Sequence, residues 1–447
     1  MTLSPTPRLL LAGALILALA GCDTFKDLVS VRADEERLPG ERLSVLVLEK
    51  AIKADPEIAD EPVRLPPPMI NDTWPQQGGT ANHAMHHLAM GDPLTVLWRR
   101  SVGSGETDDN LILSTPVVAD GKAFVLDANT AVSAYDLASG DEVWTVDLMP
   151  DNEDSEASLG GGVAYSRGRL YVTTAFGEIV ALDARTGARA WTSRVGAPMR
   201  NAPTVAGGRV FAITFNNELH VLDARDGATL WTHAGITESA GLLGSAVPAV
   251  SGDLVIAPYS SGELFALRVE NGRVAWTDSL IFQGRIGART TLSDIDGSPV
   301  VDRGWVFAIS HSGRLVALDL RSGRRRWDQE ISGSQTPWVA GDYIFLLTSN
   351  ANMVCLRRAD GRVRWVRPLP RFEDPENREG VITWSGPVLI GDRLVAVSNT
   401  GEAVAVSPYT GAILGLQEFP DGARVPPIVA NKTLYILTMD ADLVALR

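Results

Sequence analysis

One pattern recurs along most of the chain and restricts what it can fold into. Its best copy begins Val180-Ala181-Leu182-Asp183 and continues through Thr186 and Gly187 to Trp191. Copies of the strand that carries this tryptophan are centred on positions 98, 144, 191, 231, 276, 327, 365 and 415, which are 38 to 51 residues apart. A repeat of this length is typical of a β-propeller, in which each blade is a four-stranded sheet.

Each copy of the pattern describes two strands joined by a tight turn. The run Ile179–Leu182 is apolar on both alternating faces, which is typical of a strand buried between two layers. Asp183 and Thr186 can bond the backbone of the turn, and Gly187 supplies the positive φ that the turn needs. Trp191 is large enough to fill the gap between stacked sheets.

The two open ends of the repeat region match each other. The strand around Trp98 has no turn before it, and the run Val444–Leu446 has no turn after it. Pairing these strands would close the ring and remove exposed sheet edges. We therefore expect an all-β fold, an eight-bladed β-propeller over residues 76–447. The last copy has Gly415 where tryptophan is expected. A seven-bladed ring with a divergent extra unit is the alternative.

The N-terminus has the features of an export signal. Arg8 precedes the apolar run Leu9–Ala20, which is too short to span a bilayer permanently. The run ends in Leu19-Ala20-Gly21-Cys22, which resembles the bacterial lipobox. This predicts a signal peptide over residues 1–21 and acylation of Cys22, which would anchor the mature chain to a membrane. An ordinary signal peptide with a chance cysteine is the alternative.

The next segment differs in composition from the repeats. Residues 22–75 are rich in acidic residues, arginine and proline, and predict a largely extended tether. The apolar stretch Leu43–Leu48 could dock as a strand or a short helix. Apart from Cys22 the chain has only Cys355, in the apolar run Met353–Leu356, so we expect a buried thiol and no intramolecular disulfide.

The charge and the motif content argue against several functions. The formal net charge is −14, which argues against nucleic acid as a partner because phosphate contacts need clustered Lys and Arg. The sequence has no G-x-x-x-x-G-K-[ST], H-E-x-x-H or G-x-S-x-G motif. His83, His86 and His87 form the one histidine cluster, which we interpret as a solvated loop rather than a metal site. We predict no catalytic residue, no cofactor and no metal.

Asp294-Ile295-Asp296 lies in the connection between two expected blades, just before Pro299. Two carboxylates that are two residues apart in an extended segment point the same way. A binding role and a role in capping turns remain equally open for this pair.

The repeat A-L-D-x-x-[TS]-G-x-x-x-W resembles that of proteins related to pyrroloquinoline-quinone (PQQ) dehydrogenases. The segment Trp74-Pro75-Gln76-Gln77-Gly78-Gly79 is similar to their N-terminal W-P-Q-x-G motif. Within that group, the lipobox, the chain length and the eight blades resemble the BamB family, the lipoproteins of the outer-membrane β-barrel assembly machine. The closest stretch is Ser293–Val301 followed by Gly313–Gly323.

The BamB resemblance implies a non-enzymatic scaffold on the periplasmic face of the outer membrane. Such proteins bind the POTRA domains of BamA through loops on one face of the ring and assist nascent barrel proteins. Carried over to this chain, the partner-binding residues are Asp294 and Asp296, with Leu242 and Leu243 in a neighbouring loop. The enteric pattern has an arginine where this chain has Leu243. Asp23, next to the acylated cysteine, leaves the inner membrane open as the site of the anchor.

Two other functions remain open from the sequence. A PQQ-dependent alcohol or sugar dehydrogenase shares the repeat, but such enzymes typically carry adjacent cysteines and calcium ligands, and this chain has no Cys-Cys pair. The second is a generic scaffold in envelope assembly, which the sequence does not distinguish from the first choice.

Overall fold

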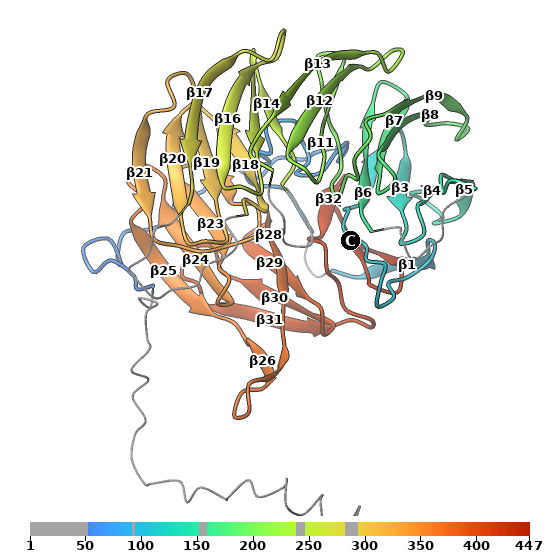
Figure 1. Cartoon of the computed structure of the whole chain (residues 1–447). Coiled ribbons are helices and arrows are strands. Elements are labelled where there is room, and N and C mark those ends of the chain that lie inside the picture. Colours follow the sequence, from blue (N-terminus) through green and yellow to red (C-terminus); the bar gives the residue numbers. More distant parts are fainter. Residues whose placement is uncertain (1–51, 92–93, 152–158, 238–245, 282–293) are drawn as a thin grey trace, which may run out of the picture. The chain divides into compact units, whose positions relative to one another are not determined.

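The repeat region forms a ring of eight four-stranded antiparallel sheets, the blades of a β-propeller (Figure 1). The structure is a computed structural model that describes residues 52–91, 94–151, 159–237, 246–281 and 294–447, and every regular element within these ranges is a strand. No helix in them has the length and apolar character needed to cross a bilayer. The prediction of an all-β, eight-bladed propeller is confirmed, and the seven-bladed alternative is wrong.

Seven blades consist of strands that are consecutive in the sequence. Blades 1 to 4 are β2 (Val117–Ala119), β3 (Lys122–Leu126), β4 (Ala131–Asp136) and β5 (Glu142–Asp147); β6 (Gly161–Ser166), β7 (Arg169–Thr174), β8 (Glu178–Asp183) and β9 (Arg189–Arg194); β10 (Thr204–Ala206), β11 (Arg209–Ile213), β12 (Glu218–Asp223) and β13 (Thr229–Ala234); β14 (Ala249–Ser251), β15 (Leu254–Pro258), β16 (Glu263–Arg268) and β17 (Val274–Ser279). Blades 5 to 7 are β18 (Gly297–Asp302), β19 (Trp305–Ile309), β20 (Leu315–Asp319) and β21 (Arg325–Gln329); β22 (Trp338–Ala340), β23 (Tyr343–Leu347), β24 (Asn352–Arg357) and β25 (Val363–Pro368); β28 (Trp384–Ile390), β29 (Arg393–Ser398), β30 (Glu402–Val406) and β31 (Ile413–Glu418).

Blade 8 joins the two ends of the repeat region. It combines β32 (Ile428–Ala430), β33 (Thr433–Leu437) and β34 (Asp442–Leu446) with β1 (Val96–Ser101) as its outer strand. Trp98 stands opposite Ala445 in this antiparallel pair. The predicted closure of the ring by the N-terminal strand and the C-terminal strands is therefore confirmed.

The repeated tryptophans connect neighbouring blades. Each indole N–H donates to a carbonyl in the turn of the next blade, with N–O distances of 2.8 to 3.3 Å, and the indole ring packs on the glycine of that turn. A Cβ on Gly323, for example, would lie 2.6 Å from the Trp276 ring. The pairs are Trp98 with Gly140, Trp144 with Gly187, Trp191 with Gly227, Trp231 with Gly272, Trp276 with Gly323, Trp327 with Gly361, and Trp365 with Gly411.

This contact explains why the last copy of the repeat lacks its tryptophan. Gly415 lies in β31, which faces blade 8. In that blade the third and fourth strands, β34 and β1, come from opposite ends of the repeat region, so no turn joins them. A tryptophan at position 415 would have no turn on which to dock.

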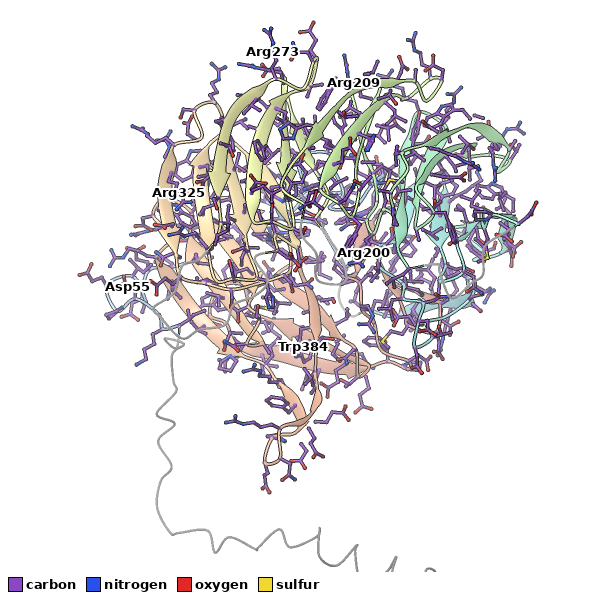
Figure 2. All side chains as sticks on the ribbon, in the orientation of Figure 1. Asp55, Arg200, Arg209, Arg273, Arg325 and Trp384 are labelled. Atoms are coloured by element: carbon purple, nitrogen blue, oxygen red, sulfur yellow. The ribbon has the colours of Figure 1, made fainter. Side chains whose placement is uncertain are left out.

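Residues 52–66, which the sequence assigns to the tether, are packed on blade 6. The Arg362 guanidinium binds the Asp55 carboxylate at 2.7 and 2.8 Å and also pairs with Glu57. Asp55 is labelled at the left edge of the ring in Figure 2. Ile58 is 2% exposed and Val63 is 7% exposed. The acidic composition suggested a solvated chain, but arginines of blade 6 supply the opposite charge, so the segment docks instead.

A two-stranded hairpin, β26 (Phe372–Asp374) and β27 (Glu379–Val381), connects blades 6 and 7. It projects from the ring at the bottom of Figure 1. Cys355 is a free thiol that is fully buried in β24, as predicted, and its burial raises its pKa well above the ordinary value.

Candidate functional site

The segment Met69–Gly91 runs once around the ring axis, and we call it the hub. It touches the first strand of every blade, in chain order, starting at blade 8 and ending at blade 7. The contacts are Asn71 with Val429 and Asn431, Trp74 with Val118, Pro75 with Tyr165, Gln76 with Val205, Ala81 with Val250, Asn82 with Val301, His86 with Trp338, and Leu88 with Leu389 and Gly391. The hub thus bonds to all eight innermost strands.

The glycines of the hub allow its sharpest turn. Gly78 and Gly79 have φ values of +74° and +80°, in the left-handed region that favours glycine. The amide of Gly79 donates to the Gln76 carbonyl at 2.8 Å, which closes the turn. A Cβ on Gly78 would lie 2.7 Å from the His83 ring, so the side chains that follow fold back over this turn.

The three histidines lie in the hub, and the expectation of a solvated loop is wrong for two of them. His83 is 4% exposed and its Nδ1 bonds the Pro299 carbonyl at 2.7 Å. His87 is 3% exposed, and its two ring nitrogens lie within hydrogen-bonding distance of the carbonyls of Pro66 and Gly391, one of which accepts the ring N–H of the neutral imidazole. Because these contacts join the hub to blades 5 and 7, the cluster has a structural role. No group of three metal-ligating side chains occurs among the described residues.

A cavity of about 730 Å³ lies at the axis, and the hub forms its floor. Trp74, Gln77, Gly78 and His83 contribute from the hub. The wall comes from connections that lead into the first strands and from turns between the second and third strands, mostly of blades 5 to 8 and blade 1. We call this cavity the axial pocket.

Six buried polar side-chain atoms around the axial pocket have no hydrogen-bond partner in the described protein. They are Trp74 Nε1, Gln77 Oε1, His83 Nε2, Thr115 Oγ1, Asp296 Oδ2 and His311 Nδ1. Buried polar atoms are normally paired, because leaving one unpaired costs on the order of 1–3 kcal/mol. All six atoms are closed off from the space of the pocket as well as from bulk solvent, so they form a polar layer packed behind the pocket surface.

Two ionisable groups at the pocket, His83 in the floor and Asp296 in the wall, are uncharged near neutral pH. Burial raises the pKa of Asp296 to about 8, with a further contribution from the negative charge of Asp294. Burial lowers the pKa of His83 to about 4, against the opposing effect of its bond to Pro299. Arg424 in the wall is paired with Glu106 at 3.0 Å.

The predicted Asp294–Asp296 pair is divided between two environments. Asp294 is 1% exposed, and its backbone carbonyl accepts a bond from the His311 amide at 2.9 Å. Its charge also acts on Arg200, although burial is the larger effect and lowers the pKa of Arg200. Arg200 covers the Phe215 ring at 4.1 Å and lies toward the middle of the ring in Figure 2. Asp296 instead lines the axial pocket.

The other predicted site residues, Cys22, Leu242 and Leu243, lie outside the described residues. The described residues next to the loop of Leu242 and Leu243 do show where its C-terminal end is attached. The Val247 amide donates to Ser298 Oγ at 3.1 Å, and Asn201 Nδ2 donates to the Ala246 carbonyl at 2.7 Å. This end is therefore adjacent to the Asp294–Asp296 connection.

Sequence reasoning missed most of the pocket. Thr115 and His311 belong to separate connections and turns that no motif links. The segment Trp74–Gly79 could have pointed to the pocket, because it supplies part of the floor and the turn of the hub. In the sequence it indicated only the resemblance to a family.

Comparisons with known proteins agree on one family. Residues 128–367 match the family model described as outer membrane protein assembly factor BamB. The chain is 36% identical over 263 residues to the outer membrane protein assembly factor BamB of Salmonella typhimurium (strain LT2). The aligned region covers 56% of this chain and 65% of that relative. The match thus spans less than two thirds of the relative's own length.

Solved structures share the fold. The crystal structure of BamB from Moraxella catarrhalis superposes with a TM-score of 0.67 and 22% identity, covering 79% of this chain and 99% of that one. A europium-containing methanol dehydrogenase reaches a TM-score of 0.66 at 16% identity, covering 82% of this chain and 89% of that one. At these identities the likeness concerns the fold alone. The relatives matched by sequence are named as assembly factors, which agrees with the prediction of a non-enzymatic protein.

Proposed function

Because this chain belongs to the family of outer membrane protein assembly factor BamB, we propose that it is a non-enzymatic scaffold of the outer-membrane β-barrel assembly complex. In this proposal it binds the POTRA domains of BamA and assists the insertion of β-barrel proteins. The scaffold is a rigid ring, and the binding residues are held on connections between its blades.

The observation that carries the proposal is the grouping of three consecutive blade connections. Arg200, Val247 and Asp294 come from the connections that lead into blades 3, 4 and 5. The Val247–Ser298 bond and the bond from Asn201 to Ala246 join these connections to one another. A partner domain that docks here would contact several blades at once, which favours a specific orientation.

In this proposal Asp294 and Asp296 are positioning residues of the docking face, and Leu242 and Leu243 supply apolar contacts. The burial of Asp294 supports a role in holding the connection, since its carboxylate is shielded from a partner. The apolar pair suits the desolvated centre of an interface.

We further propose that acylated Cys22 anchors the ring on the periplasmic face of the outer membrane. About 30 residues lie between Cys22 and the first docked residues on blade 6, and their number sets an upper limit on the distance between the anchor and the ring. This reach would let the ring meet a partner near the membrane. An inner-membrane anchor, which Asp23 leaves open, would be detected by membrane fractionation.

Nascent outer-membrane proteins are the proposed clients. β31 is the outermost strand of blade 7, and all six of its residues are exposed. Among them Ile413, Leu414 and Leu416 are 45%, 57% and 60% exposed. An apolar edge strand of this kind can accept an extended client segment by strand addition.

The docking face is tested by crosslinking in cell envelopes with two double variants and one control. Leu242→Asp with Leu243→Asp, and Asp294→Asn with Asp296→Asn, should each reduce the yield of BamA crosslinks several-fold. Asparagine keeps the shape of each aspartate, so a thermal melt can verify that the ring is folded. Asp226→Asn, in an exposed turn of blade 3, is the control and should leave the crosslinks unchanged.

The same experiment separates the proposal from a generic envelope scaffold. Crosslinks to BamA that persist in both docking-face variants would remove this face from the interface. Crosslinks to a different envelope protein, with none to BamA, would favour the generic scaffold.

A further inference from the structure

Residues 52–66, which we call the strap, show what kind of peptide blade 6 binds. Two arginines from the turn between β24 and β25 hold its acidic side chains. Arg362 binds the Asp55 carboxylate through two nitrogens, and Arg357 pairs with Glu61 at 3.0 Å. Pairs of this kind, with Arg donating to a carboxylate, are both charge-assisted and directional. The turn of blade 6 therefore recognises an acidic segment.

The strap also covers an apolar side chain of blade 6. The Asp55 amide donates to the carbonyl of Val363, the first residue of β25, at 2.8 Å. Ile52 packs against the hydrophobic cluster that contains Val363. As a result Val363 is only 8% exposed. The binding site for the strap thus combines two arginines with a valine.

Blade 4 has the same three side chains at the same positions of the repeat. No other turn between a third and a fourth strand has arginine at both of these positions. In both turns the amide of the first arginine donates to the carbonyl of the second at 2.8 Å, so the backbones match. The corresponding residues are Arg268 and Arg357, Arg273 and Arg362, and Val274 and Val363. We call Arg268, Arg273 and Val274 the blade 4 site.

No described segment covers the blade 4 site. Val274 is 50% exposed, in contrast to its counterpart beneath the strap. Arg273, labelled at the top of Figure 2, is exposed and its side chain has no partner among the described residues. Arg268 pairs with Asp253, but both side chains are more than half exposed. Such a pair contributes little to stability, so a carboxylate of a ligand can replace Asp253.

We propose that the blade 4 site binds an extended acidic segment of a partner protein, in the way that blade 6 binds the strap. Two carboxylates of the segment pair with Arg268 and Arg273, and a neighbouring apolar side chain covers Val274. The charge of the site and the segment already bound to its counterpart in blade 6 both favour this occupant. Blade 4 has Ala275 where blade 6 has Arg364, which donates to a strap carbonyl, so the partner segment is held less tightly than the strap.

The test is a calorimetric titration of the purified full-length protein with a synthetic peptide that has the sequence of residues 52–66. We expect saturable binding at low ionic strength, which weakens as salt is added. Arg268→Gln combined with Arg273→Gln should weaken it by roughly fivefold, because two exposed charge pairs are lost. The melting temperature should not change, since Asp253 stays in contact with water.

Two matched controls separate specific binding from a general effect of charge. In the first, the peptide carries Asp55→Asn, Glu57→Gln and Glu61→Gln, and it should bind the parent more weakly by a similar factor. In the second, the protein carries Arg185→Gln and Arg189→Gln, which remove two charges from exposed positions of blade 2. This variant should bind the acidic peptide like the parent.

Absence of saturable binding would overturn the proposal, and so would equal binding by the parent and the variant of the blade 4 site. Binding that depends on Arg357 and Arg362 instead would mean that the peptide exchanges with the strap. A dimer of the parent that Arg268→Gln with Arg273→Gln abolishes would make a second copy the occupant.

An anionic membrane is the remaining alternative for the blade 4 site. Sedimentation with phosphatidylglycerol vesicles that requires Arg268 and Arg273, without binding of the peptide, would assign the site to lipid phosphates and overturn the proposal. Crosslinking to BamA does not depend on blade 4 arginines, so this proposal and the proposed function fail independently.

Discussion

The Ala89 amide donates a hydrogen bond of 2.7 Å to the Met69 carbonyl, so the hub meets its own start after one circuit of the axis. Between these two residues the chain bonds to the first strand of all eight blades. A ring that closes only through β1 and β34 would depend on a single strand pair. The hub adds a second closure at the axis and supplies the floor of the axial pocket.

The first prediction concerns the turn of the hub. Gly78→Ala should lower the free energy of unfolding by about 1–2 kcal/mol, because alanine is strained at a φ of +74° and its Cβ would contact His83. Gly91→Ala is the control, since a Cβ there meets no atom within 4 Å. Denaturant melts of the two variants measure the difference. Equal stability would contradict the role given to the turn.

The second prediction concerns a buried ion pair between blades 5 and 6. Arg358 and Asp302 are 6% and 8% exposed, and the guanidinium also donates to the Asp302 carbonyl at 2.7 Å. Arg358→Ala should lower the free energy of unfolding by about 3 kcal/mol, because the buried Asp302 carboxylate then keeps only its longer contacts with His86 and Arg303, at 3.5 and 3.6 Å. Arg225→Ala removes an exposed pair with Asp223 and should change the melt little. A small effect of Arg358→Ala would contradict the stabilising role given to this pair and would mean that His86, Arg303 or water compensates the Asp302 charge.

The third prediction concerns pH. An unfolded aspartate has a pKa near 3.9, and burial raises that of Asp296 to about 8. Between these values the folded state keeps a proton that the unfolded state has lost, so the contribution of Asp296 to stability falls as the pH rises from about 4 to about 8.

Asp296→Asn should remove this contribution. The melting temperature of the variant relative to the parent should therefore increase between pH 5 and pH 9. Asp226→Asn, at an exposed turn, should show no such trend. A difference between Asp296→Asn and the parent that is constant across this range would mean that Asp296 is ionised in the folded protein.

The repeat was sufficient to predict the blades, the closure by β1 and β34, and the place of the tryptophans. It could not predict the hub, because each blade contributes only one to three bonds to it and the segment itself has no periodic pattern. Nor could it predict the docking of residues 52–66, since Glu61 meets Arg357 only 296 residues later in the chain. One residue of the sequence did indicate this docking, because Arg357 stands where other copies of the repeat have an aspartate and so offers a positive charge to the acidic segment.

The candidate site was predictable in part. The spacing of Asp294 and Asp296 drew attention to the right connection, but alternation along an extended segment says nothing of burial. Their separation into a buried residue and a pocket residue depends on the hub and on blades that are distant in sequence. Leu242, Leu243 and Cys22 stay predictions.

The most direct test of the central claim is purification of the acylated full-length protein from detergent-solubilised membranes, followed by identification of what accompanies it. The account predicts that BamA is recovered in near-stoichiometric amount. Recovery of a folded, membrane-extracted protein without BamA, in a preparation where BamA is itself intact, would contradict it.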